Sequence, residues 1–175
     1  MKRFQLIMIA ALFILCPAAI FAQNSTPVAA VKSFYEYDRS HSQTFTWSAI
    51  EARRKWFTPE LYKLFQKELK RERDFLKKHP KDKTYFGDGL PFQPIDETCG
   101  TGGKGKHKAL TFKAEPVAGV TASVQAIFAF PKPCTEPDTT IYTVKLVKRP
   151  NGWLIDDVQF EGDRSLVPDL KRKDY

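Results

Sequence analysis

The sequence predicts an α+β fold in which N-terminal helices stack on one face of an antiparallel β-sheet. Apolar residues recur at helical spacing between residues 26 and 80, and helix-start signals accompany them. After residue 108 the pattern changes to the apolar–polar alternation that is typical of strands. Asn151-Gly152 separates the last two alternating segments and indicates a β-hairpin. Helices followed by a meander of strands define the α+β class.

Residues 1–22 have the pattern of a secretory signal peptide. Lys2 and Arg3 precede an apolar run over residues 4–15, and small residues follow as far as Ala22. The run covers about 12 residues, which is shorter than the ~20 that span a bilayer. We therefore expect cleavage after Ala22 and no stable membrane anchor afterwards.

The remaining chain, residues 23–175, is expected to form a single domain with its core at about 27–162. A signal peptide implies an exported protein, either periplasmic or secreted. Cys16 raises the alternative of a lipoprotein, but Leu15 stands where lipid-modified proteins carry a small residue. The sequence therefore favours export without lipidation.

Removal of the signal peptide would leave two cysteines, Cys99 and Cys134, in an oxidising compartment. A disulfide between them would close a loop of about 36 residues and stabilise the fold by roughly 3–4 kcal/mol. Two free buried thiols are the alternative. The histidines His41, His79 and His107 have no ligand spacing with each other or with the thiols, so we expect no metal and no cofactor.

The chain is basic, with a formal net charge of +8. Without Lys2 and Arg3, 26 basic residues face 20 acidic ones, and the excess is concentrated in residues 63–83 and 171–173. A basic surface suits an acidic protein, an anionic envelope surface or nucleic acid, and export makes nucleic acid the least suitable of these. The candidate partner-facing residues are Lys67, Lys70 and Arg71. A solvated helix face is the simpler alternative.

The first two helices are marked by their N-terminal signals. Thr26-Pro27 supplies a hydroxyl cap and a proline at the first helical position, and the helical pattern runs to about Tyr37. Ser48 and Glu51 have the spacing of a capping box, which predicts that the second helix begins at Ser48. Trp47 would then pack onto Ala52 as a hydrophobic staple.

Thr58-Pro59 repeats the cap-plus-proline signal and opens the longest predicted helix, which Pro80 ends. At about 20 residues it would be a rod of about 30 Å. The loop-rich segment 80–107 follows, and in it Asp88 and Phe92 combine acidic and aromatic character. This loop either covers the mouth of a pocket or tucks its Phe residues into the edge of the core.

Residues 100–106 match the G-x-x-x-x-G-K spacing of a phosphate-binding loop. His107 stands where Ser or Thr should hold magnesium, and a strand follows where a helix is required. A flexible basic turn is the better interpretation. Serine-nucleophile chemistry also lacks its characteristic motif.

Four strands are predicted over residues 108–115, 120–130, 139–148 and 153–160. In the last of them, alternation would put Trp153, Ile155 and Asp157 on one face. A carboxylate on an inward face must form an ion pair, have a raised pKa that suits proton transfer, or lie at a wet strand end. Asp157 is therefore the candidate general base, and a structural ion pair is its main alternative.

Two local patterns and the order of elements resemble the nuclear-transport-factor-two-like superfamily, which includes SnoaL and ketosteroid isomerase. The patterns are the opening Ala30-Val-Lys-Ser-Phe-Tyr35 and the closing Asn151-Gly-Trp-Leu-Ile-Asp-Asp-Val158. The Thr58–Leu61 helix start and the Asp88 and Pro91-Phe92 loop are similar to exported bacterial domains of unknown function in that superfamily.

The resemblance implies a strongly bent antiparallel sheet wrapped against helices, which leaves a conical cavity. It implies a cavity carboxylate as base in the enzymes, for which Asp157 is the matching position, and dimers formed through the sheet. Candidate ligand-pocket residues are then Tyr35, Asp88, Phe92, Trp153 and Asp157. No second acid, Tyr dyad or His partner matches the enzymes of the superfamily.

Two functions therefore stay open, with a purely structural envelope accessory as a minor third, and a non-enzymatic binding function is preferred. The first is an exported binding module for a small ligand, an envelope component or a protein, including partners of the immunity or inhibitor type. The alternative is a small cavity enzyme that uses Asp157 for proton transfer, hydration or isomerisation.

Overall fold

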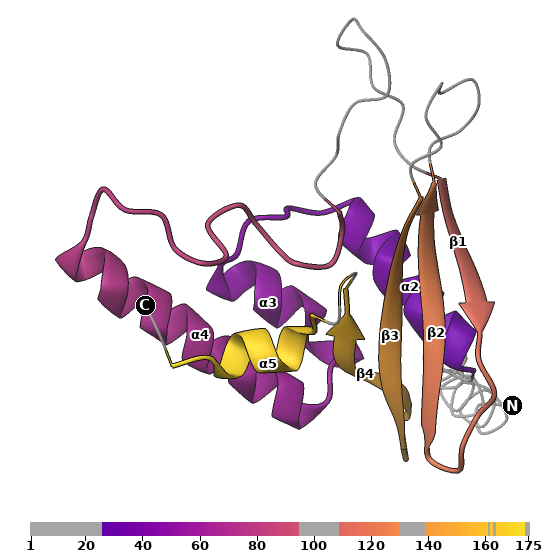
Figure 1. Cartoon of the computed structure of the whole chain (residues 1–175). Helices are drawn as coiled ribbons and strands as arrows, with labels where there is room; N and C mark the ends of the chain where they lie inside the picture. Colours follow the sequence, from indigo (N-terminus) through magenta and orange to yellow (C-terminus); the bar gives the residue numbers. More distant parts are fainter. Residues whose placement is uncertain (1–25, 95–108, 130–138, 161, 163, 174–175) are drawn as a thin grey trace, which may run out of the picture.

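The computed structural model describes residues 26–94, 109–129, 139–160, 162 and 164–173. Helices come first along the chain and a sheet follows, and a short helix closes the described part (Figure 1). The elements are α2 (Pro27–Arg39), α3 (Trp47–Arg53), the 3₁₀ turn η2 (Arg54–Trp56), α4 (Pro59–Lys78), β1 (Ala109–Ala114), β2 (Thr121–Ala129), β3 (Thr139–Arg149), β4 (Gly152–Gln159) and α5 (Leu166–Lys171). The signal peptide, Cys16, the Cys99–Cys134 pair and the glycine-rich segment 100–107 lie outside the described residues.

The sheet has four antiparallel strands in the order β1-β2-β3-β4, so the α+β prediction is confirmed. Each strand pairs with its sequence neighbour, and the described strands form an open sheet. The predicted hairpin joins β3 to β4, but its two turn residues are Pro150 and Asn151, because Arg149 pairs with Gly152, which has φ of 115°. Glycine adopts this left-handed conformation without a steric penalty.

Two of the predicted helix starts are confirmed. The Thr26 hydroxyl accepts a hydrogen bond from the Ala29 amide at 3.1 Å, and α2 begins at the next residue. The Thr58 hydroxyl accepts one from the Leu61 amide at 3.2 Å, and α4 runs for 20 residues from Pro59. In both helices the cap satisfies an amide that has no partner within the helix.

The predicted N-cap of the second helix is wrong by two residues. Thr46, not Ser48, is the cap, because its hydroxyl accepts from the Ala49 amide at 3.3 Å. Trp47 is therefore the first residue of the helix, 46% exposed, and Ala52 is exposed as well, so the expected staple does not form. Both hydroxyl residues can cap a helix, so the residue type alone does not choose between them.

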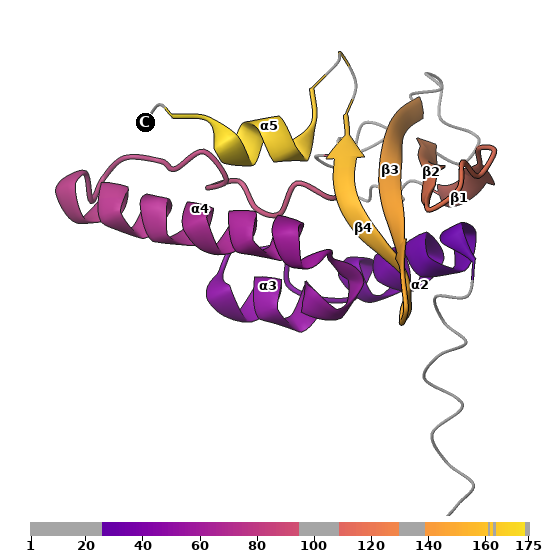
Figure 2. The ribbon, with the colours of Figure 1, turned by 90° about the horizontal axis from the view of Figure 1, so that it is seen from below.

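The β4 edge of the sheet is covered by the segment that leads into α4. Phe57 forms a parallel bridge with Ile155, and the Thr58 amide donates to the Ile155 carbonyl at 2.9 Å. The Thr58 hydroxyl also donates to Asp156 Oδ1 at 2.9 Å. These bonds fix the origin of α4 against the sheet. From there α4 runs away from the strands, so its C-terminal half projects beyond the sheet (Figures 1 and 2).

The core lies between α2, the inner face of the sheet and the first turns of α4, and it is rich in aromatic rings. Phe34 of α2 is at its centre, with ring centroids 5.0–5.9 Å from those of Tyr35, Trp56, Phe57 and Phe92. Edge-on packing dominates among these pairs, as the quadrupoles of aromatic rings favour.

A buried ion pair ties the end of α2 to α3. Arg53 Nε donates to Asp38 Oδ1 at 2.7 Å, and the two side chains are 1% and 0% exposed. The guanidinium also donates to the carbonyls of Ala49 and Ser42, and Gln93 Nε2 donates to Asp38 Oδ2 at 2.6 Å. The charges are therefore compensated by hydrogen bonds as well as by each other.

The loop over residues 84–94 is part of the core. Phe86, Leu90 and Phe92 are all buried, which agrees with the alternative that its Phe residues tuck into the core. The Phe86 amide donates to Glu72 Oε1 at 2.9 Å. The loop passes so close to residue 43 that a Cβ on Gly89, which has φ of 128°, would lie 2.7 Å from the Gln43 carbonyl oxygen. A segment held this tightly is unsuited to opening as a lid.

The C-terminal tail is fastened alongside α4. Arg172 Nη2 bonds Glu68 Oε1 at 2.5 Å, and Arg71 binds both the other Glu68 oxygen and the Arg172 carbonyl. The Arg172 guanidinium lies 3.6 Å from the centroid of the Tyr85 ring. This cluster places the following residue, Lys173, beside the middle of α4.

Candidate functional site

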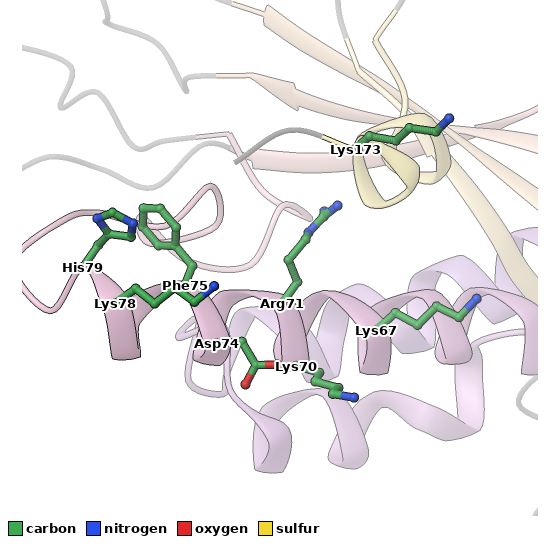
Figure 3. Close-up of a pocket in the computed structure, with 8 residues that line it drawn as sticks. All are labelled: Lys67, Lys70, Arg71, Asp74, Phe75, Lys78, His79 and Lys173. Carbon is green, nitrogen blue, oxygen red and sulfur yellow. The ribbon is translucent and has the colours of Figure 1, made fainter.

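A groove of about 630 Å³ runs along the projecting part of α4 (Figure 3). One wall is a stripe of the helix and the other is formed by the C-terminal tail. The lining residues are predominantly basic: Lys67, Lys70, Arg71, Asp74, Phe75, Lys78, His79 and Lys173.

Helical periodicity explains why these side chains meet. Positions 67, 70, 71, 74, 75 and 78 recur at intervals of three and four residues, which places them on one face of a helix with 3.6 residues per turn. The Thr58 cap and Pro59 fix where this helix begins, and it ends at His79, before Pro80. The sequence alone therefore determines most of the stripe.

The lysines of the groove are available for a partner. Lys67, Lys70, Lys78 and Lys173 are exposed, and none of them forms an ion pair with another described residue. Several positive charges gathered along a groove raise the local concentration of anions. The sequence-predicted residues Lys67, Lys70 and Arg71 are brought together here, but Arg71 holds the tail through Glu68 and the Arg172 carbonyl.

Four groove residues on α4 and at its C-cap were not included in the prediction from sequence. Asp74, Phe75, Lys78 and His79 continue the helical spacing that begins at Lys67, so the same period could have identified them. Lys173 could not be assigned in that way, because only the folded tail places it opposite the helix.

The candidate ligand-pocket residues do not gather in one place. Phe92 and Trp153 are buried, Phe92 among aromatic rings of the core. Asp88 is on the surface and forms an ion pair with Lys83. Tyr35 is buried, and it also lines a separate pocket of about 360 Å³ between α2 and β1.

The prediction that Asp157 shares a face with Trp153 and Ile155 is wrong. The register of β3 and β4 shifts by one residue: Leu146 pairs with Ile155, but Lys145 pairs with Asp157. A β-bulge at Asp156 supplies the extra residue and reverses the alternation beyond it. Asp157 consequently lies on the face that carries Lys145, the one opposite the core.

Asp157 anchors α5 to the sheet. Its Oδ1 accepts hydrogen bonds from the backbone amides of Val158 and Val167, each at 2.9 Å. The second of these amides belongs to the first turn of α5. The carboxylate is therefore engaged with backbone at the junction of β4 and α5.

We expect Asp157→Ala to lower the free energy of unfolding by about 1–3 kcal/mol, because two amides lose a charged acceptor. Asp157→Asn keeps one acceptor oxygen and should cost about half as much. Urea unfolding of both variants measures the difference. An alanine variant as stable as the parent would contradict this anchoring role.

The Tyr35 hydroxyl is a buried polar group without a hydrogen-bond partner in the part of the chain that the structure describes. Burial raises the pKa of Tyr35 well above its ordinary value, and the nearby Asp38 carboxylate and Tyr142 phenol raise it further. Below this raised pKa the phenol stays protonated.

We expect Tyr35→Phe to stabilise the fold by about 1–2 kcal/mol near neutral pH, because the variant buries no unsatisfied hydroxyl. Above pH ~10 the unfolded chain loses the Tyr35 proton while the folded chain keeps it, so the parent should lose stability by up to about 1.4 kcal/mol per pH unit from this group. Phenylalanine removes that contribution. Urea unfolding at neutral and alkaline pH measures how the free energy of unfolding of each protein changes with pH. An equal pH dependence in both proteins, with a less stable variant, would contradict the expectation.

The chain matches no protein-family model, no curated protein and no solved structure. What the fold and the site define is an α+β protein with an open, four-stranded antiparallel sheet and a basic groove on its longest helix. Among the described residues, no helix has the length and hydropathy to cross a membrane. The described residues also hold no cluster of three or more His, Cys, Asp or Glu side chains that could bind a metal ion.

Proposed function

We propose that the protein is a non-enzymatic binding module that engages an acidic protein through the groove along α4. The observation that carries the proposal is the gathering of Lys67, Lys70, Lys78 and Lys173, without ion-pair partners among the described residues, in one concave site. Such a surface accelerates encounter with an oppositely charged partner and fixes its orientation.

The position of the groove supports the same function. It lies on the half of α4 that projects beyond the sheet, where a partner can approach without displacing a strand (Figure 2). The groove is also rigid on its tail side, since Glu68 is fully buried between Arg71 and Arg172. Preorganisation of this kind reduces the entropy cost of binding.

The proposal also covers the location of the protein outside the cytoplasm and the superfamily to which its fold belongs. The signal-peptide pattern of residues 1–22 implies that the acidic partner is met outside the cytoplasm. The order of helices and strands, with α2 against the inner face of the sheet, supports assignment to the nuclear-transport-factor-two-like superfamily. The proposed site differs from the conical cavity which that resemblance implies.

Reversing two charges in the groove tests the proposal. With fluorescein-labelled hexaglutamate as the acidic probe, Lys67→Glu together with Lys70→Glu should lower the association rate by at least about tenfold at about 0.01 M salt. At about 1 M salt the screening length falls to ~3 Å and the difference should vanish. Stopped-flow fluorescence measures the rates.

Lys63→Glu together with Lys113→Glu is the matched control, because it makes the same change in net charge away from the groove. Both residues are exposed and neither lines the groove. Equal losses from the two pairs would mean that net charge alone attracts the probe, and the proposed site would be wrong.

A further inference from the structure

The α4 groove has two chemically different ends. Near its middle the tail is bound through Arg71, which brings Lys173 to the side of the helix that carries Lys67 and Lys70. At the other end the rings of Phe75 and His79 stack, with centroids 4.7 Å apart and planes at 24° (Figure 3). The groove therefore combines a cationic end, which has three lysines, with an aromatic end, where two stacked rings lie beside the single lysine Lys78.

The carboxylate of Asp74 lies between these ends. Its ion pairs with Lys77 at 3.3 Å and Arg73 at 3.9 Å join half-exposed side chains, and such pairs are weak, so they leave the Asp74 carboxylate able to face a ligand. A ligand with continuous negative charge would be repelled at this position. A ligand whose negative charge stops before Asp74 would not be.

The length of the groove sets the size of the occupant. His79, the C-cap of α4, is twelve positions after Lys67, which corresponds to about 18 Å at a rise of 1.5 Å per residue. An extended peptide covers that distance with about five or six residues. At the same helical rise, the distance along the helix from the cationic end to the aromatic pair corresponds to roughly three residues of an extended peptide ligand.

We infer that the groove binds a short extended segment of the partner protein that carries carboxylates at one end and an apolar side chain about three residues away. This inference rests on the proposed function and specifies the ligand of that site. The carboxylates contact Lys67, Lys70 and Lys173, and the apolar side chain packs on the ring of Phe75. Asp74 selects against ligands that are anionic along their whole length.

The test compares labelled hexapeptides by fluorescence anisotropy with the purified protein. The mixed peptide contains, in order, three glutamates, two glycines and a phenylalanine, and it is also made in reverse order. Comparison peptides replace the phenylalanine by glycine or all residues by glutamate. We expect one orientation of the mixed peptide to bind about tenfold more tightly than the peptide without phenylalanine and more tightly than hexaglutamate.

Protein variants show which residues cause the tighter binding of the mixed peptide. Phe75→Gln should remove the advantage of the mixed peptide and leave the peptide without phenylalanine unaffected. Leu76→Gln is the matched control, since Leu76 is the neighbouring apolar residue, 39% exposed, and does not line the groove. His79→Gln gives a second variant in case Phe75→Gln does not fold. Asp74→Asn should raise the affinity for hexaglutamate severalfold and change that for the mixed peptide less than twofold.

The outcomes separate this inference from the function on which it rests. If hexaglutamate binds as tightly as the mixed peptide, and both depend on Lys67 and Lys70, the binding module stands and the acidic–apolar segment is wrong. If no peptide depends on these lysines, both are wrong. If phosphatidylglycerol vesicles bind through the lysines and the peptides do not, the ligand is a lipid surface and the inference is overturned.

Discussion

Replacing Arg53 by methionine is expected to lower the free energy of unfolding by about 3–5 kcal/mol, because it leaves the Asp38 carboxylate buried without a countercharge. The two side chains are almost completely inaccessible, at 1% and 0% exposure. The substitution also removes the donors to the carbonyl of Ala49 in α3 and to that of Ser42 in the segment between α2 and α3. Urea unfolding followed by circular dichroism measures the loss.

A double-mutant cycle separates the contribution of the ion pair to the free energy of unfolding from the contribution of side-chain packing. Asp38→Asn keeps an acceptor for Gln93 but has no charge, so Asp38→Asn combined with Arg53→Met should be more stable than Arg53→Met alone. We expect a coupling energy of at least about 1 kcal/mol. Strictly additive losses would show that the ion pair does not act as a unit.

Phe92→Ala is expected to cost about 3–5 kcal/mol, because it opens a cavity among rings that cannot collapse to fill it. Phe92 is 0% exposed, and its ring centroid lies 5.0, 5.6 and 5.8 Å from those of Phe34, Phe57 and Phe65. The substitution would therefore loosen the join between α2, α4 and the loop over residues 84–94. Thermal and urea unfolding both report this loss.

Phe92→Leu keeps most of the volume and should cost less than about 2 kcal/mol. The pair of variants also tests the earlier assignment of Phe92 to a ligand pocket. A fully stable alanine variant would mean that the side chain lines an open cavity. A large loss that leucine mostly restores would place it in the packed core.

Local signals account for most of what the sequence predicted correctly. Thr26 and Thr58 cap their helices through hydroxyls that bond amides three residues away, and the hairpin that Asn151-Gly152 indicated forms with Pro150 and Asn151 as its two turn residues. The four strands follow from alternation that is visible in single segments. Each of these features depends on residues that are close together in the chain.

The errors have non-local causes. The face of Asp157 depends on a one-residue shift against β3, and no alternation within residues 153–160 reveals it. Of the groove, the stripe from Lys67 to Lys78 could be predicted from the helical period. The position of Lys173 depends on the contacts of Glu68 and Arg71 with Arg172, which join residues more than 100 positions apart in the chain.

The most direct test of the proposed binding surface is amide chemical-shift mapping by nuclear magnetic resonance, with hexaglutamate added to the labelled protein. The account predicts that the shifts concentrate on residues 67–79 and on Lys173, while the strand residues 110–112 and 141–145 stay unchanged. Shifts confined to the pocket around Tyr35 or to the face of the sheet that carries Lys145, with α4 unaffected, would contradict it.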